Sequence, residues 1–207
     1  KYFPKSPIYG LIIPMETKRK NLSIIAILSS LTAVVLHSYL TYKYYGLKYG
    51  FSNSSLCNIN QKFNCDVAST SSYADIFGVP IAMLGALTNL VIIIFLFNIF
   101  ISNKEAQRSY RYGYYLTIFT FVVSIVMGVI STLFLSSYCP FCLATYALSL
   151  ITLACYHLSF NKQPRMAFSE DFSQLFIEHK SSLYMLLAIP LLGIFINWNI
   201  QKRFTGD

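Results

Sequence analysis

Two cysteines stand one helical turn apart at the start of an apolar run, in the stretch Tyr138-Cys139-Pro140-Phe141-Cys142-Leu143-Ala144-Thr145-Tyr146. A C-x-x-C pair at the beginning of a helix is typical of a redox centre, because its thiols are close enough to form a disulfide. The helix N-terminus also favours the thiolate over the thiol. The same pattern fits half of a metal site, or two buried cysteines with no chemical role, so the rest of the chain has to decide.

The composition indicates a membrane protein, since 55% of the residues are hydrophobic and only 12% are charged. Apolar runs recur, and each is long enough for the roughly 20 residues that a membrane-spanning helix needs. The net charge of +8 is attributed to Lys and Arg in cytoplasmic loops and is not taken as a sign of nucleic-acid binding. The first run is full length and lacks a small-residue cleavage site, so we do not expect a cleavable signal peptide. The sequence therefore predicts an all-α integral membrane protein.

The apolar runs predict five transmembrane helices, at about residues 22–42, 79–101, 112–135, 140–158 and 182–200. The first four form a four-helix transmembrane bundle, and the fifth is an addition to it. Pro80 is expected in the first turn of the second helix, where its missing N–H costs nothing. The predicted division is a cytoplasmic N-terminal segment at 1–21, a core at 22–158 with an outer loop at 43–78, a cytoplasmic loop at 159–181 with a short amphipathic helix near Phe168–Ile177, and a fifth helix with an outer tail at 182–207.

Loop charge predicts the orientation of these helices. With the N-terminus in the cytoplasm, that side carries most of the basic residues: Lys1, Lys5, Lys18, Arg19, Lys20, Lys104, Arg108, Arg111, Lys162, Arg165 and Lys180. The other side holds fewer, namely Lys43, Lys48, Lys62, Lys202 and Arg203, so the positive-inside rule supports this topology. Both outer cysteine pairs, Cys57 with Cys65 and Cys139 with Cys142, then lie on the oxidising side, where disulfides persist. In a bacterium this would be a multi-pass inner-membrane protein with its cysteines facing the periplasm.

The two pairs suit a thiol relay. Cys57 and Cys65 lie on a loop that can exchange with an external partner and then attack the fixed pair. The fixed pair lies at the membrane surface, where a quinone is the obvious lipid-soluble acceptor. Four thiolates around zinc are the competing interpretation, although seven residues separate Cys57 from Cys65, more than in the close-spaced pairs of a structural zinc site. The fifth cysteine, Cys155, is expected to be a small apolar filler inside the fourth helix.

A longer set of residues carries a family resemblance: Cys57 to Cys65, Asp66, Ser71, Phe77-Gly78-Val79-Pro80 and Gly85, then Cys139-Pro140-Phe141-Cys142 and Tyr146. In this combination the chain resembles the vitamin K epoxide reductase family, over about residues 22–158. The resemblance implies a catalytic four-helix core. In bacterial homologues a fifth helix leads to a thioredoxin-like domain on the outer side. This sequence ends at Asp207 without a second C-x-x-C of that type, so we expect a separate partner or a domain that was removed.

The resemblance implies a role for each sulfur. Cys142 would meet the quinone, either ubiquinone or menaquinone. Cys139 would exchange with the loop pair through Cys65. Cys57 would meet the thiol of a periplasmic thioredoxin-like disulfide catalyst.

The resemblance also implies a quinone site. Ser71 would lie on a short helix across the site, and Tyr146, one turn below Cys142 on the same helix face, would donate a hydrogen bond to a quinone oxygen. Phe141 and Phe77 complete the predicted binding residues, and further candidates for the walls are Ile81, Leu84 and Met83. Spacing alone leaves Ser71 open as a solvated serine and Tyr146 open as an interfacial tyrosine.

Other polar residues have weaker expectations. Asp66 follows Cys65 and is expected to cap the short helix, with tuning of the thiol as the alternative role. Phe77 with Gly78 is expected to set the turn into the second membrane helix. His37 lies within the first predicted membrane helix, where a polar group invites a functional interpretation. A structural use is equally open for a residue near a helix end.

Together these expectations describe a membrane thiol oxidoreductase. It would carry electrons from a thioredoxin-like partner through Cys57 and Cys65 to Cys139 and Cys142 and then to a quinone, supporting disulfide bond formation. Two alternatives remain open: a reductase of vitamin K quinone or its epoxide, and a non-enzymatic membrane scaffold with two structural disulfides. The unrelated four-helix disulfide oxidase of bacteria is disfavoured, because its C-x-x-C lies in the earlier outer loop. Neither a metal nor nucleic acid is expected as a partner.

Overall fold

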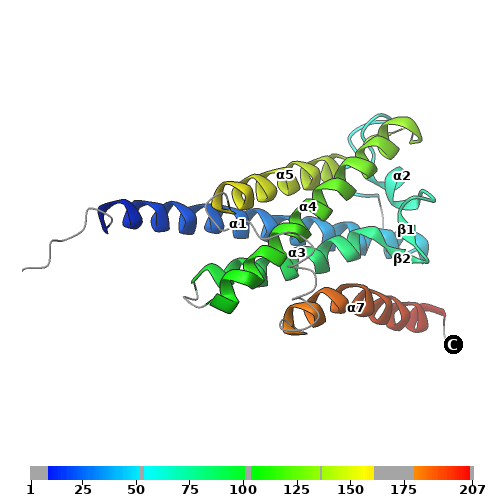
Figure 1. Ribbon diagram of the computed structural model, residues 1–207. Coiled ribbons are helices and arrows are strands. Elements are labelled where there is room, and N and C mark those ends of the chain that lie inside the picture. The colour runs from blue at the N-terminus through cyan, green and yellow to red at the C-terminus, as the bar shows by residue number, and fades with distance from the viewer. Residues whose placement is uncertain (1–8, 52–53, 101–103, 136, 161–179, 206–207) are drawn as a thin grey trace, which may run out of the picture.

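The computed structural model describes residues 9–51, 54–100, 104–135, 137–160 and 180–205. Within these ranges the regular secondary structure is helical apart from one small hairpin (Figure 1). The elements in chain order are α1 (Tyr9–Lys48), α2 (Cys65–Thr70), β1 (Asp75–Ile76), β2 (Val79–Pro80), α3 (Ile81–Phe97), a 3-10 turn (Asn98–Phe100), α4 (Lys104–Leu133), α5 (Pro140–Phe160) and α7 (Lys180–Thr205).

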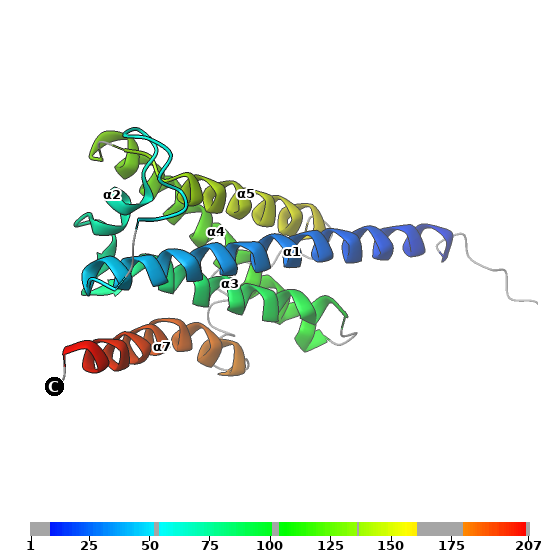
Figure 2. The same ribbon diagram turned by 180° about the vertical axis from the view of Figure 1, so that it is seen from behind.

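Four helices form a closed bundle in which α1 packs against α3 and α5, and α4 packs against the same two from the other side. Helix α7 lies outside this bundle and contacts α3 and the hairpin, as the two opposite views agree (Figures 1 and 2). The predicted arrangement of a four-helix core with one additional helix is therefore what the structure has.

Length and apolar composition allow four of the described helices to cross a membrane, over Arg19–Lys48, Tyr110–Leu133, Pro140–Ser159 and Lys180–Phe204. Helix α3 is also apolar but has only 17 residues, and the 3-10 turn extends it. The predicted start of this helix at Val79 is wrong, because Val79 and Pro80 pair with Ile76 and Asp75 in the antiparallel hairpin. The helix can begin only after that pairing ends, at Ile81.

Other helices run past their predicted ends. Helix α1 begins at Tyr9 and continues to Lys48, and neither proline nor glycine interrupts residues 15–45. At about 1.5 Å per residue a helix of this length is longer than the roughly 30 Å apolar core of a bilayer, and its N-terminal part extends beyond the other helices (Figure 1). The amphipathic helix expected near Phe168–Ile177 lies outside the described residues.

The half of the bundle nearer the N-terminus of α1 is packed solid by aromatic side chains. Tyr110 and Tyr156 are fully buried and stack with their ring centroids 4.7 Å apart, and Phe95 of α3 joins the same cluster. Gly113 makes this packing possible, since a Cβ there would lie 2.3 Å from the Tyr156 hydroxyl and 2.7 Å from Phe95 Cβ. Cys155, a free thiol, is buried in the same cluster, so its predicted role as an apolar filler fits its surroundings.

The opposite end of the molecule carries the hairpin, α2 and the start of α5 (Figure 1). Helix α7 is attached here by one buried hydrogen bond, in which Tyr45 Oη donates to Asn197 Oδ1 over 2.6 Å. The ring of Phe204 near its end stacks against both Tyr49 and Phe51, with centroid distances of 4.9 Å. These contacts fix the additional helix beside the end of the bundle that contains the cysteine pairs.

Candidate functional site

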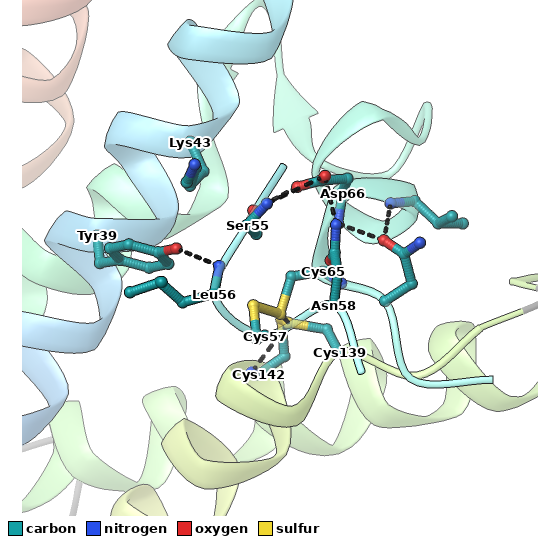
Figure 3. Close-up of a disulfide and its surroundings, with 12 residues drawn as sticks. Tyr39, Lys43, Ser55, Leu56, Cys57, Asn58, Cys65, Asp66, Cys139 and Cys142 are labelled. Atoms are coloured by element: carbon teal, nitrogen blue, oxygen red, sulfur yellow. Dashed lines mark hydrogen bonds between the residues drawn. A yellow bond between two sulfur atoms is a disulfide. The ribbon is translucent and has the colours of Figure 1, made fainter. Parts of the chain in front are cut away.

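Four cysteines meet where the outer loop reaches the start of α5 (Figure 3). They form two disulfides, Cys57–Cys65 and Cys139–Cys142. The disulfides touch each other, since Cys65 Sγ and Cys139 Sγ are 3.4 Å apart and both residues are buried. The structure therefore brings together all four cysteines singled out in the sequence, with Cys65 and Cys139 as the contacting members of the two pairs.

A short backbone connection positions this sulfur contact. Phe63 forms a parallel bridge with Tyr138, in which the Tyr138 N–H donates to Lys62 O at 2.8 Å and the Asn64 N–H donates to Tyr138 O at 2.9 Å. Cys65 and Cys139 are the residues that follow the two bonded segments, so the bridge carries their sulfur atoms toward each other.

Helix α2 places Cys65 at its first residue. Asn64 is the N-cap, and its Oδ1 accepts hydrogen bonds from the N–H groups of Asp66 and Val67 at 2.9 and 3.3 Å. The predicted capping role of Asp66 is therefore wrong, because the asparagine two residues earlier takes that place. The cap fixes the direction in which α2 leaves the loop, and with it the position of Cys65.

Asp66 instead holds the other arm of the loop. Its carboxylate accepts hydrogen bonds from the Ser55 hydroxyl, from the Ser55 N–H at 3.2 Å and from Asn58 Nδ2 at 2.5 Å. Asn58 in turn accepts the Cys65 N–H at 2.9 Å through its Oδ1. The hydrogen bonds of Asn58 and Asp66 thus tie the segment that contains Cys57 to the start of α2, where Cys65 lies (Figure 3).

The start of α5 gives Cys139 the surroundings of a good leaving group. Cys139 directly precedes the first residue of the helix, Pro140, and the Cys142 N–H donates to Cys139 Sγ over 3.1 Å. A backbone donor and a helix N-terminus both stabilise negative charge on sulfur. The proline has no N–H to offer at this position, so the donor comes from Cys142, one turn along.

A cavity opens beside the C-x-x-C pair, with about 730 Å³ of empty space when its open mouth is included. Cys139 and Cys142 lie in its wall, and α2 covers part of it. The described lining residues are largely apolar and come from all four bundle helices, among them Leu40, Ile81, Ala82, Met127, Ile130 and Tyr146. Such a cavity suits a flat apolar molecule with a few polar atoms.

Not every residue predicted to bind the quinone lies in this cavity. Ser71 and Tyr146 line it, as does Ile81. Phe77 does not, because it occupies the tip of the β1–β2 hairpin with a positive φ of 52° and its side chain is fully exposed. Phe77 and Gly78 do form the turn that precedes the second membrane helix, with positive φ at both residues.

Phe141 also lies outside the lining of the cavity. Its ring packs edge-on against Tyr39 of α1, 5.3 Å between centroids, and it touches the cysteine cluster from the side. Two other candidates for the walls, Met83 and Leu84, belong to the apolar cluster that α7 covers. A residue between two cysteines on one helical turn faces a different direction from either of them.

Among the lining residues, His37 and Tyr146 carry polar groups that form no hydrogen bond within the described structure. No described group forms a hydrogen bond with the Tyr146 hydroxyl, and Nδ1 of His37 is buried without one. Residues with unpaired polar groups in the wall of an apolar cavity fit a ligand with carbonyl oxygens, such as a quinone. The sequence marked His37 only as a polar residue in a membrane helix, and the rotation of α1 about its axis is what brings it to the cavity.

Comparison with known proteins places this geometry in one family. The sequence model of the vitamin K epoxide reductase family matches residues 24–156, which include α2, α3, α4, both disulfides and most of α1 and α5. The chain belongs to the vitamin K epoxide reductase family. Searches of curated proteins and of solved structures gave no significant match.

Membership in the vitamin K epoxide reductase family makes this chain a membrane oxidoreductase that acts on thiols and quinones. The two disulfides lie against each other, and the cavity opens beside the Cys139–Cys142 pair. The matched residues end before α7, so this helix is an addition to the family core.

Proposed function

We propose that this chain oxidises a thioredoxin-like protein on the periplasmic side of the membrane and passes the electrons to a quinone. The observation that carries the proposal is the 3.4 Å contact between Cys65 Sγ and Cys139 Sγ. A structural disulfide has no need of a second disulfide against its sulfur atom. A relay requires this contact, because thiol–disulfide exchange proceeds by attack of one sulfur on another.

The first exchange takes place at the loop. A thiolate of the partner attacks Cys57 Sγ, the Cys57–Cys65 bond breaks, and Cys65 leaves as a thiolate. Cys65 then attacks Cys139 Sγ, and the Cys139–Cys142 bond breaks to free Cys142 as a thiolate facing the cavity. The partner's second thiol resolves its bond to Cys57 and carries the new disulfide away.

Two further steps return the chain to its starting state. The freed Cys57 attacks Cys65, which restores the loop disulfide and leaves Cys139 and Cys142 as a dithiol. When bound, the quinone accepts two electrons and two protons as that dithiol closes to a disulfide. The N–H of Cys142, 3.1 Å from Cys139 Sγ, stabilises negative charge on that sulfur. Cys142 and Tyr146 would contact the quinone ring, and the apolar walls of the cavity would exclude water.

The assignment of sides rests on loop charge and on the position of the cysteines. The cysteine site lies at the end of the bundle opposite the N-terminus of α1 (Figure 1), and the basic residues Lys18, Arg19 and Lys20 lie toward that N-terminus. A cytoplasmic N-terminus and a periplasmic site in a bacterial inner membrane follow from the positive-inside rule. Ubiquinone and menaquinone are the proposed acceptors.

The test is quinone-dependent thiol oxidation by the purified chain in lipid nanodiscs, with reduced thioredoxin as the thiol donor. We expect Cys142→Ser to lower the rate at least 100-fold, because no thiolate then faces the cavity. Cys155→Ser is the matched control, since this buried thiol lies in the aromatic cluster and forms no disulfide, and it should retain the wild-type rate. A Cys142→Ser variant with normal turnover would show that the cysteines are structural, and replacing the quinone by vitamin K epoxide tests the reductase alternative.

A further inference from the structure

His37 of α1 lines the cavity and lies against α3. The ring rests directly on Gly85 of α3. A Cβ at Gly85 would lie 2.7 Å from His37 Cε1 and 2.8 and 2.9 Å from the two ring nitrogens. The absence of a side chain at Gly85 is therefore what allows the imidazole to occupy this place.

The imidazole has no partner within the described residues. Among the described lining residues, only His37 has a buried polar atom, Nδ1, that lacks a hydrogen bond. Three other polar groups of the lining do have partners: Tyr44 donates to Asp75, Ser71 to Ala68 O and Thr145 to Cys142 O. A buried polar group without a partner costs free energy unless a ligand or water supplies the missing hydrogen bond.

A quinone offers what these free groups need. It carries two carbonyl oxygens, which accept hydrogen bonds, on a flat apolar ring. The neutral imidazole of His37 has one N–H to donate, and the hydroxyl of Tyr146 provides a second donor from a different helix. The remaining described walls are mostly aliphatic and suit the ring.

We propose that His37 is a quinone-binding residue that donates a hydrogen bond to one carbonyl oxygen, while Tyr146 donates to the other. Gly85 leaves the space that the His37 ring occupies and so holds it in position. This inference rests on the proposed function, because it names a second contact for the acceptor of the same site. It assigns to α1 and α3 a part in acceptor binding that the cysteine motifs do not indicate.

The experiment measures binding rather than turnover. Oxidised full-length protein in nanodiscs is titrated with a short-chain ubiquinone and with a short-chain menaquinone, and the carbonyl stretch of isotope-labelled quinone is recorded by infrared difference spectroscopy. We expect His37→Phe to weaken binding about tenfold, the loss of one buried hydrogen bond. The shifted carbonyl band of the bound quinone should move back toward its free position, whereas His37→Gln keeps an N–H donor and should retain most of both signals.

A glycine pair provides the matched control. Gly85→Ala leaves His37 chemically intact but displaces it, and should also weaken binding about five- to tenfold. Gly128→Ala changes a glycine of α4, where a Cβ would meet the Tyr146 ring at an ordinary 3.7 Å, and should leave binding unchanged. If His37→Phe does not fold, the quinone affinity of Gly85→Ala shows whether His37 takes part in binding.

Two results would overturn the inference, each in a distinguishable way. If the wild-type protein binds quinone and both His37→Phe and Gly85→Ala bind it equally well with the same carbonyl band, His37 has no role in binding. If the wild-type protein binds neither quinone, the proposed function itself fails, and this inference fails with it.

Discussion

The two halves of the bundle are built in opposite ways. At the half nearer the N-terminus of α1, Tyr110, Tyr156 and Phe95 leave almost no exposed surface and α4 approaches closely at Gly113. At the other half the same helices enclose a cavity, and the outer loop and the two disulfides lie beside it. The aromatic cluster therefore makes the bundle rigid at the end away from the cysteines, so the cavity can stay open without the bundle collapsing.

The largest expected effect breaks the solid half. Tyr156→Ala removes a fully buried ring that stacks on Tyr110 and should lower the free energy of unfolding by about 2–4 kcal/mol, since the cavity left behind loses its packing contacts. The measurement is unfolding in mixed micelles of increasing denaturing-detergent fraction. Turnover per folded molecule should stay within about twofold of wild type, because the ring lies far from the sulfur atoms.

Tyr184→Ala is the control for that change. Tyr184 is 65% exposed on α7, so its loss should alter the unfolding free energy by less than about 0.5 kcal/mol. Equal destabilisation by the two variants would contradict the idea that the aromatic cluster carries the rigidity of the bundle.

An intermediate effect is expected at the hollow half from Asn58→Ala. This change removes the acceptor of the Cys65 N–H and the donor to Asp66. The loss of these two hydrogen bonds should destabilise the folded loop by about 1–2 kcal/mol. We expect electron transfer from the loop pair to Cys139 to slow about tenfold, measured by rapid quenching and alkylation of each thiol after mixing with reduced thioredoxin.

Asn199→Ala provides the comparison, because Asn199 also donates to a backbone carbonyl, that of Phe195, but on α7. Its exchange rate should equal that of the wild type. An unchanged rate in Asn58→Ala would mean that the bridge between Phe63 and Tyr138 is enough to position Cys65, and that the hydrogen bonds of Asn58 are not needed.

The smallest effect is expected at the hairpin tip. Phe77 is fully exposed at φ 52°, a conformation that asparagine tolerates better than a bulky residue. Phe77→Asn should therefore change the unfolding free energy by less than about 1 kcal/mol, in the stabilising direction. Quinone affinity, measured by titration in nanodiscs, should stay the same, and a weaker affinity would show that this tip reaches the cavity.

The solid and hollow halves also differ in how far the sequence predicted them. The membrane helices and the start of α5 at Pro140 followed from the hydrophobic runs, and loop charge predicted that both cysteine pairs lie on one side of the membrane. The exchange of Cys65 with Cys139 was implied by the family resemblance. Cys142 and Tyr146 both line the cavity, as expected for residues four apart on one helix. Hydrophobic runs and helical spacing involve residues close together in the chain, so they can be read from a single sequence.

Other features depended on contacts that no local pattern shows. The membrane helices are apolar around much of their circumference, so no polar face reveals that α1 turns His37 toward the cavity. Phe141 is next to both cysteines in sequence, yet Tyr39 of α1 draws its ring out of the site. Phe77 was directed outward by the positive φ of the hairpin turn, which depends on the pairing of β1 with β2.

The bridge between Phe63 and Tyr138 has a consequence for how such a loop can change length. It fixes the register of residues 62–65 against 138–139, and a shift by one residue would turn a side chain to the opposite face of an extended segment. A residue inserted between Lys62 and Cys65 would therefore separate the two sulfur atoms. Asn60 tightens this restriction, because its side-chain oxygen accepts the N–H groups of Lys62 and Phe63, each at 2.9 Å. The outer loop therefore has no freedom to change its length between Asn60 and Cys65 without separating the Cys57–Cys65 disulfide from the Cys139–Cys142 disulfide.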